Sequence, residues 1–268
     1  SDYMDRNRYL RQAQNLLQYA NSCHEDHCMA KAHSTLASAY LYTGRLQEAI
    51  EEGNQAYQYA VKVKQDPFLE FDCLLILGNA YKQSEQKKKE AFEKYWDASL
   101  LAYKIENDSL LAESYSHLSD FYFDIENYDS ARSFKLKQYQ LLLRHPNDSV
   151  PLMRTWMGMA SVEFALNLPN EAGEKLREVI RFAEPHQIEV LKDNAFQFFR
   201  SHFMAQEDPK GLFALYQRFP EELEHVRQSD TPAYYRIMAL VWDAKGPPDS
   251  AHRYYQLAMQ AQRESNQY

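Results

Sequence analysis

The sequence predicts an all-α fold, a right-handed superhelix built from antiparallel helix pairs. The first observation is a group of the form Leu-small-x2-Tyr, which recurs every 41 residues and begins at Leu36, Leu77 and Leu118. The second is an alanine nine to ten residues after each of these tyrosines, at Ala49, Ala91 and Ala131. The third is the small number of helix breakers, 7 glycines and 10 prolines in 268 residues, which suits long helices. A fixed period of about 20–50 residues is typical of stacked helical or mixed units.

Composition and charge narrow the class of protein further. The chain carries a formal charge of −8, with 38 acidic and 30 basic residues, so it lacks the basic excess of a general nucleic-acid or membrane-surface binder. Hydrophobic residues make up 45% of the chain, which is enough for a continuous core. No apolar run approaches the roughly 18 residues of a membrane span. We therefore expect no direct nucleic-acid partner and no membrane contact by this segment.

The period divides the chain into a lone helix and six helix pairs that form a single array over residues 1–268. The lone helix is expected at 5–20, and the repeats near 30–68, 71–106, 112–145, 153–185, 192–226 and 232–266. Small residues recur where the first helix of a pair (helix A) meets the second (helix B): Ala37, Gly78, Ser119, Ala160 and Ala239 in A, and Ala49, Ala91, Ala131, Ala172 and Ala251 in B. They let the two helix axes approach to about 8–10 Å. The fifth pair is degenerate, because Phe199 and Gly211 occupy these positions.

Turn and cap residues agree with these boundaries. Gly44 and Gly246 fall in the turn between helices A and B, where a residue with positive φ closes a helix. Pro169 and Pro248 fall in a first helical turn, where the missing N–H costs nothing. Asn-Asp-Ser recurs at 107–109 and 147–149, and because it is locked to the repeat we interpret it as a helix cap rather than a glycan site. One extra residue within 84–89 predicts a loop insertion.

These residues resemble the tetratricopeptide repeat, whose pattern is Leu-Gly/Ala-x2-Tyr followed by Ala-x3-Phe/Tyr-x2-Ala. Five of the six units match. The 41-residue step exceeds the usual 34 of the family, so each unit is longer by about two helical turns. Such long units are similar to those of bacterial peptide-pheromone receptors and of sensor proteins from Bacteroidetes. The Asp-Ser-Ala groups that open helix B at Asp129 and Asp249 are similar to the latter.

The resemblance implies that helix A lines a concave groove and that a ligand binds there. An asparagine at the Asn79 position is expected to hydrogen-bond the ligand backbone, and the acidic residues would favour a basic or neutral ligand. The basic clamp of the chaperone-binding subfamily is missing, since Glu113 and His117 occupy two of its positions. The alternative, that these residues form only a solvated face, stays open. The expected groove residues are Asp72, Leu75, Asn79, Lys82, Glu113, Ser116, Asp120, Phe123, Arg154, Ser161, Phe164 and Arg200.

The one segment dense in potential metal ligands is Cys23-His24-Glu25-Asp26-His27-Cys28. On a helix, Cys23 with His27 and His24 with Cys28 would form two i,i+4 pairs, but a structural zinc needs four converging ligands. One hexapeptide does not easily turn both pairs toward one ion. We therefore expect a polar loop between helices, no metal, and a Cys23–Cys28 disulfide if the domain is exported. Cys73 is expected to be a buried apolar residue.

The sequence contains no nucleophile motif, no glycine-rich phosphate loop and no His-Glu-x-x-His. We therefore expect no catalytic residues, no cofactor and no enzyme activity. The function predicted is a protein- or peptide-binding module, the sensory or scaffold part of a longer bacterial protein. The alternative is a structural or self-assembly domain that uses the convex face or the open ends. Oligomeric state stays open, and an extracytoplasmic location is favoured over a cytoplasmic one.

Overall fold

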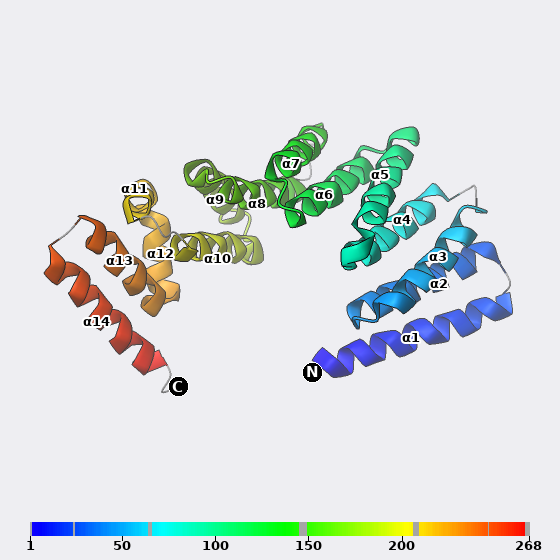
Figure 1. Cartoon of the computed structure of the whole chain (residues 1–268), viewed down its shortest axis with the longest axis horizontal. Coiled ribbons are helices and arrows are strands. Elements are labelled where there is room, and N and C mark those ends of the chain that lie inside the picture. The colour runs from blue at the N-terminus through cyan, green and yellow to red at the C-terminus, as the bar shows by residue number, and fades with distance from the viewer. Residues whose placement is uncertain are drawn as a thin grey trace. The chain divides into compact units, whose positions relative to one another are not determined.

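The computed structural model describes residues 2–23, 25–63, 66–144, 149–205, 209–245 and 247–265. These residues form fourteen α-helices and one short 3₁₀ helix, with no strand among them (Figure 1). The predicted all-α class is confirmed. The chain divides into two compact units, Ser1–Pro146 and Asn147–Tyr268. None of the described helices combines the length and the apolar character needed to cross a membrane.

Unit 1 is a stack of three helix pairs with one additional helix at its N-terminal end. Each A helix packs against the B helix that follows it, α2 on α3, α4 on α5 and α6 on α7, and α1 packs against α2. The helix expected at 5–20 is therefore present as α1 and is longer than predicted. The helices are α1 (Asp2–Cys23), α2 (Asp26–Tyr42), α3 (Leu46–Ala60), α4 (Pro67–Lys82), the 3₁₀ helix η1 (Glu85–Lys87), α5 (Lys88–Lys104), α6 (Asp108–Asp124) and α7 (Tyr128–Leu142).

The expected small residues lie at the contact between the two helices of each pair. Ala37, Ala49, Ala91 and Ala131 are fully buried, as is Ser119, whose hydroxyl donates a hydrogen bond to the Ala131 carbonyl at 2.8 Å. Serine is tolerated here because this bond satisfies its buried hydroxyl across the seam. The close approach that the repeat pattern predicts is thus confirmed in unit 1.

The turn from helix A to helix B needs a positive φ in three of the repeats. Gly44 in the first repeat has φ 76°. The equivalent turn residues of the third and fourth repeats, Glu126 and Asn167, have φ 61° and 58°. Of these three residues only Gly44 is glycine, so the position in the repeat, and not the residue type, determines the positive φ. At Glu126 and Asn167 this conformation has a steric cost, because these residues carry a Cβ. In the second repeat η1 occupies this place, where the sequence carries its extra residue. Gly246 lies outside the described residues.

Helix starts follow the cap chemistry that the sequence indicates. The Asn107 side chain accepts a hydrogen bond from the Leu110 amide at 3.0 Å, so this residue caps α6 as predicted. Asp66 and Asn127 cap α4 and α7 in the same way. Pro169 is the first residue of α9, also as predicted. Asn147, the second expected Asn cap, lies outside the described residues.

Unit 2 begins and ends with regular helix pairs, α8 with α9 and α13 with α14. One buried cluster draws on α8, α9, α10, α12 and α13 and on the residue between α11 and α12; it includes Leu176, Phe199, Phe219 and Ile237. The helices are α8 (Ser149–Ala165), α9 (Pro169–Ala183), α10 (Glu189–Ala205), α11 (Pro209–Arg218), α12 (Pro220–Ser229), α13 (Thr231–Lys245) and α14 (Pro248–Ser265).

The degenerate fifth repeat differs from the regular pairs. Where one helix B was expected, the chain forms two ten-residue helices, α11 and α12, that meet at Phe219. Pro220 explains the break, because proline disfavours the helical conformation in the residue before it. α11 packs on α13, and α12 packs on α13 and α10. This break adds one helix to the total of about thirteen that the period predicts.

Phe219 fills the space that a regular seam closes with small residues. Its side chain is fully buried, and its ring centre lies 5.3 Å from that of Phe199. A Cβ built on Gly173 would stand 2.3 Å from Cζ of Phe219. In the degenerate repeat, the rings of Phe199 and Phe219 therefore fill the seam that two small residues close elsewhere. The missing side chain of Gly173 leaves the space for Phe219.

Candidate binding face

Eight of the twelve expected groove residues lie in unit 1 and four in unit 2. In unit 1 they belong to α4 and α6, which contact each other, and α4 also contacts α2. Residues 41 positions apart occupy equivalent places on these helices, so Lys31, Asp72 and Glu113 form one row of exposed charged residues. We call the surface formed by α2, α4 and α6, opposite their paired B helices, the A-helix face.

Asp72 and Glu113 are two carboxylates of this row with no cationic partner. Within the described part of the chain neither side chain makes a hydrogen bond or ion pair. Partial loss of hydration raises the pKa of both carboxyl groups, and the negative charge of Asp72 raises that of Glu113 further. Asp66 adds to the rise at Asp72, whereas Lys31 opposes it. The two groups therefore form an acidic site that a cation would stabilise.

Asn79, the residue expected to meet a ligand backbone, is held by a buried tyrosine. The Tyr95 hydroxyl donates a hydrogen bond to Oδ1 of Asn79 at 2.7 Å, and the Tyr95 side chain is fully buried on α5. Burial and the nearby carboxylates of Asp120 and Asp124 raise the pKa of Tyr95, so the hydroxyl stays protonated. Because the bond takes the amide oxygen, the amide nitrogen is left as the donor for a further partner.

His117 covers the same tyrosine from the A-helix face. Its ring stacks on Tyr95, with ring centres 5.3 Å apart and planes 14° from parallel. Burial lowers the pKa of His117, and the positive charges of Lys82 and Lys135 lower it further against the opposing effect of Asp120. The imidazole is therefore neutral near pH 7. Tyr95, Asn79 and His117 are therefore uncharged, whereas the nearby side chains of Lys82, Asp120 and Lys135 are charged.

The remaining polar residues of the predicted groove in unit 1 are neutralised within the chain. Lys135 on α7 is buried and lies 3.1 Å from Oδ1 of Asp120, and its ammonium donates a hydrogen bond to Ser116 at 3.0 Å. Lys82 pairs with Asp124 at 2.8 Å. Of the acidic residues that were expected to select a basic ligand, Asp72 and Glu113 thus remain without an ion pair among the described residues, although Lys31 offsets part of the charge of Asp72.

Lys135 contacts two of the expected groove residues and was not predicted from the sequence, although the sequence carries a signal for it. It lies four residues after Ala131, as Tyr95 lies four residues after Ala91. Tyr95 reaches Asn79, and Lys135 reaches Asp120, which is 41 residues further along. In both repeats, therefore, the side chain four residues after the helix B alanine contacts the same position of helix A. A lysine in place of the repeat's usual aromatic residue could have indicated this pairing.

The two apolar groove residues of unit 1 differ in exposure. Leu75 is 6% exposed and belongs to the core cluster of unit 1, so it does not present a surface to a ligand. Phe123 is partly buried at the end of α6 and meets the ring of Tyr128 edge-on, with centres 5.3 Å apart. Phe123 can therefore contribute an apolar contact, and Leu75 contributes packing.

In unit 2 three of the four expected residues lie on α8 and the fourth lies on α10. Arg154 is exposed on α8, Ser161 is partly buried on the same helix, and Phe164 stacks on Phe198 of α10 with centres 6.1 Å apart. Arg200 pairs with Asp230 at 2.8 Å. Arg200 also lines a cavity.

That cavity has a volume of about 470 Å³, and Arg200 shares it with Asp193, Phe196, Gln197 and His225. The rings of Phe196 and His225 stack with centres 3.5 Å apart. Burial lowers the pKa of His225, with a further contribution from Lys192. The cavity thus combines a cation, a carboxylate and a flat aromatic wall, a composition suited to polar ligands.

No protein-family model matches this sequence, and no curated protein matches it. Solved structures do. A signal-transduction ATPase with a tetratricopeptide-repeat sensor, from Pyrococcus horikoshii, superposes with a TM-score of 0.65 at 14% identity, over 87% of this chain and 36% of its own. The chain thus spans about a third of that protein. RapI in its apo form gives a TM-score of 0.55 at 12% identity, over 98% and 100% of the two chains.

A third match is the Rap conjugation gene regulator of the plasmid pLS20 in complex with a Phr peptide. It gives a TM-score of 0.57 at 13% identity, over 98% of this chain and 72% of its own. The chain has the tetratricopeptide-repeat fold. The resemblance that the repeat pattern indicated is confirmed at the level of fold by these superpositions. The candidate face in unit 1 is formed by the A helices of these repeats. The structurally similar proteins include a protein with a sensor domain and a gene regulator.

Proposed function

We propose that this tetratricopeptide-repeat chain is a non-enzymatic peptide-binding module, the sensor or scaffold segment of a longer regulatory protein. Support comes from the fold it has in common with a regulator that was solved with a bound peptide. Support also comes from the A-helix face, which repeats its polar residues in register on consecutive helices. An extended peptide has a similar regular spacing of backbone groups and side chains, so a register of this kind suits it.

The observation that carries the proposal is the pair of carboxylates Asp72 and Glu113, which make no ion pair in the described residues, with a tyrosine-oriented Asn79 about two helical turns along α4 from Asp72. In this proposal the amide nitrogen of Asn79 donates to a backbone carbonyl of the peptide. A lysine or arginine of the peptide lies between the two carboxylates and lowers their mutual repulsion. Phe123 supplies an apolar contact at the end of α6. The partner class is therefore an extended peptide with at least one basic residue.

The test begins with selection of a random peptide library on the immobilised chain, followed by titration calorimetry of an enriched peptide. Enriched peptides should carry lysine or arginine. Asn79→Ala should weaken binding about 5- to 150-fold, the equivalent of about 1–3 kcal/mol for one lost buried polar partner. Phe123→Ala should cost about 2 kcal/mol if the ring anchors the peptide. Asp72→Asn should weaken basic peptides and leave neutral ones unchanged.

The matched control lies on the opposite face of the stack. Glu51 is exposed on α3 and accepts a hydrogen bond only from Gln47 of the same helix, so Glu51→Gln should leave peptide binding unchanged. Glu52, its neighbour, is a poorer control because it bonds His33 at 2.6 Å. If Glu51→Gln weakens binding and Asn79→Ala does not, the groove proposal is wrong.

The second candidate function is self-assembly through the C-terminal end. α14 exposes Tyr255 and Met259, with 41% and 58% of their surface accessible, on a helix whose main packing partner is α13. Sedimentation velocity over a range of concentrations tests this candidate. A concentration-dependent dimer that Met259→Lys abolishes would support assembly, and a monomer at all concentrations would exclude it.

A further inference from the structure

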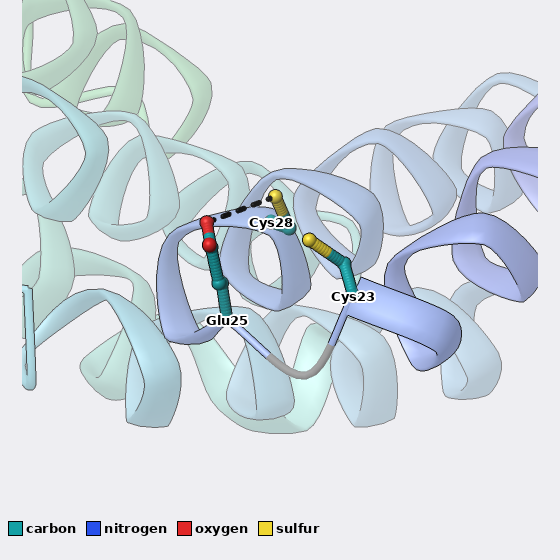
Figure 2. Close-up of side chains that lie close together, drawn as sticks. All are labelled: Cys23, Glu25 and Cys28. Carbon is teal, nitrogen blue, oxygen red and sulfur yellow. Dashed lines mark hydrogen bonds between the residues drawn. The ribbon is translucent and has the colours of Figure 1, made fainter.

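The turn between α1 and α2 brings together two thiols and a carboxylate. α1 ends at Cys23 and α2 begins at Asp26, so the segment 23–28 falls at the junction between two helices, as expected from the sequence. The i,i+4 pairs of one continuous helix therefore do not form. Instead the two Sγ atoms and a carboxylate oxygen of Glu25 all lie within 4.8 Å of one another. Figure 2 shows the three side chains gathered on one side of the turn.

The spacing of these atoms is close to that of three ligands around one ion. Cys28 Sγ lies 3.9 Å from Oε2 of Glu25. A tetrahedral zinc with its usual bond lengths holds a sulfur and an oxygen ligand about 3.5 Å apart, and two sulfurs about 3.8 Å apart. Small side-chain rotations therefore suffice to close the site. Nearby His27 does not complete it, because its Nε2 pairs with Asp66 at 3.1 Å, and His24 lies outside the described residues.

The site is open to an ion from solvent. The free thiols of Cys23 and Cys28 are both partly exposed, and the Glu25 side chain is exposed.

We propose that Cys23, Glu25 and Cys28 bind one Zn²⁺ through two thiolates and one carboxylate, with the fourth position open to solvent. Binding releases the two thiol protons to solvent, which makes it weaker at low pH. The ion links the last residue of α1 to the first turn of α2. α1 packs against α2, so the metal would add a second connection between these two helices.

The test uses the full chain without a histidine tag, reduced with a phosphine that does not bind metals. Cobalt(II) is titrated first, because a thiolate-to-cobalt charge-transfer band reports sulfur ligation directly. We expect a band that saturates at one cobalt per chain and disappears when zinc is added. Cys28→Ser and Cys23→Ser should abolish the band. Glu25→Gln should retain it with affinity reduced by about tenfold or more, since even second-shell changes often cost that much.

Cys73 provides the matched control. It is fully buried on α4, and burial raises the pKa of its thiol to about 12, so it does not ionise and Cys73→Ala should leave the band intact. Far-ultraviolet spectra of each variant check that the helices remain folded. Absence of the band in the reduced wild-type chain would overturn the proposal, as would a band that survives in Cys28→Ser. A chain that forms a Cys23–Cys28 disulfide in air and binds no cobalt when reduced would also overturn it.

Discussion

The ring of Tyr95 occupies the space in which a side chain on Gly78 would lie. A Cβ at Gly78 would stand 2.5 Å from Cε1 of the ring, which is closer than two carbon atoms can approach without displacement. The hydroxyl of the same ring orients Asn79, the next residue of α4. The absence of a side chain at Gly78 thus leaves room for the Tyr95 ring, and the Tyr95 hydroxyl in turn orients the side-chain amide of Asn79.

Gly78→Ala should therefore lower stability and disturb the binding face together. Overpacking of this seam is expected to cost about 1–3 kcal/mol, measured as a lower midpoint of urea unfolding at an unchanged slope. Tyr95→Phe, which keeps the ring and removes the hydroxyl, should cost about 1 kcal/mol. Gly53→Ala is the matched control, because the atom it approaches is the flexible end of Leu77. If both glycine variants lose the same stability, the close contact with Tyr95 is not the cause.

Asp72 and Glu113 should make the protein less stable as the pH rises. Their pKa values in the folded chain are raised above the ordinary 3.8 and 4.5. Folding therefore favours their protonated forms, and that stabilisation is lost as the pH rises through the ordinary values to the raised ones. Asp72→Asn should stabilise the chain at pH 7 by less than about 1 kcal/mol, since solvent screens both groups. The gain should vanish near about pH 3.

Glu48→Gln supplies a control of opposite sign. A hydrogen bond from Arg45 lowers the pKa of Glu48 below its ordinary 4.5, so its contribution is present above that value and is lost as the pH falls. This variant should be less stable than the wild type at neutral pH and equal to it in acid. Urea unfolding at both pH values measures the two variants side by side. The same sign for both would contradict the assignment of uncompensated charge to Asp72.

Small residues at a fixed step were sufficient to predict the helix pairs, because close packing of two helices restricts side-chain size at one position in each. The break at Phe219 was not predicted, although Pro220 carries the signal, because the period was extended across a unit that no longer follows it. The pairing of Lys135 with Asp120 joins two helices, so spacing within one helix does not reveal it. It is indicated only when Tyr95 and Lys135, the equivalent positions of successive repeats, are compared. The dense run of polar residues indicated a loop between helices and a Cys23–Cys28 disulfide on export, but it did not show that the Glu25 carboxylate would lie close to both thiols.

Ala131→Phe and Ala172→Phe should each overpack a seam. Both alanines are fully buried, and the enlarged side chain is expected to cost about 1–3 kcal/mol. Gly173→Ala should have a comparable cost, because Phe219 fills the space above it. Phe219→Leu should recover part of the Gly173→Ala loss, and a double-mutant cycle by urea unfolding measures that coupling. Additive losses would show that Gly173 and Phe219 do not interact, and a change near zero in either alanine variant would mean that the register is wrong.

The ion pair of Lys175 with Glu163 should be the most sensitive charge contact in unit 2. Glu163 is fully buried on α8, and the Lys175 ammonium on α9 lies 2.7 Å from one carboxylate oxygen and 2.8 Å from the other. Lys175→Met leaves the buried carboxylate without this cation, at an expected cost of about 2–4 kcal/mol. Lys89→Met is the control, because Lys89 and Glu93 form an exposed pair 3.7 Å apart that should be worth less than about 0.5 kcal/mol.

Adding Glu163→Gln to Lys175→Met should recover part of the loss, since the neutral amide is cheaper to bury than a carboxylate. Thermal and urea unfolding of the single and double variants measures this recovery. A double variant that is less stable than Lys175→Met alone would show that the carboxylate is held by its other contacts in the α8–α9 pair rather than by the lysine. Contacts other than the ion pair with Lys175 would then stabilise the buried carboxylate of Glu163.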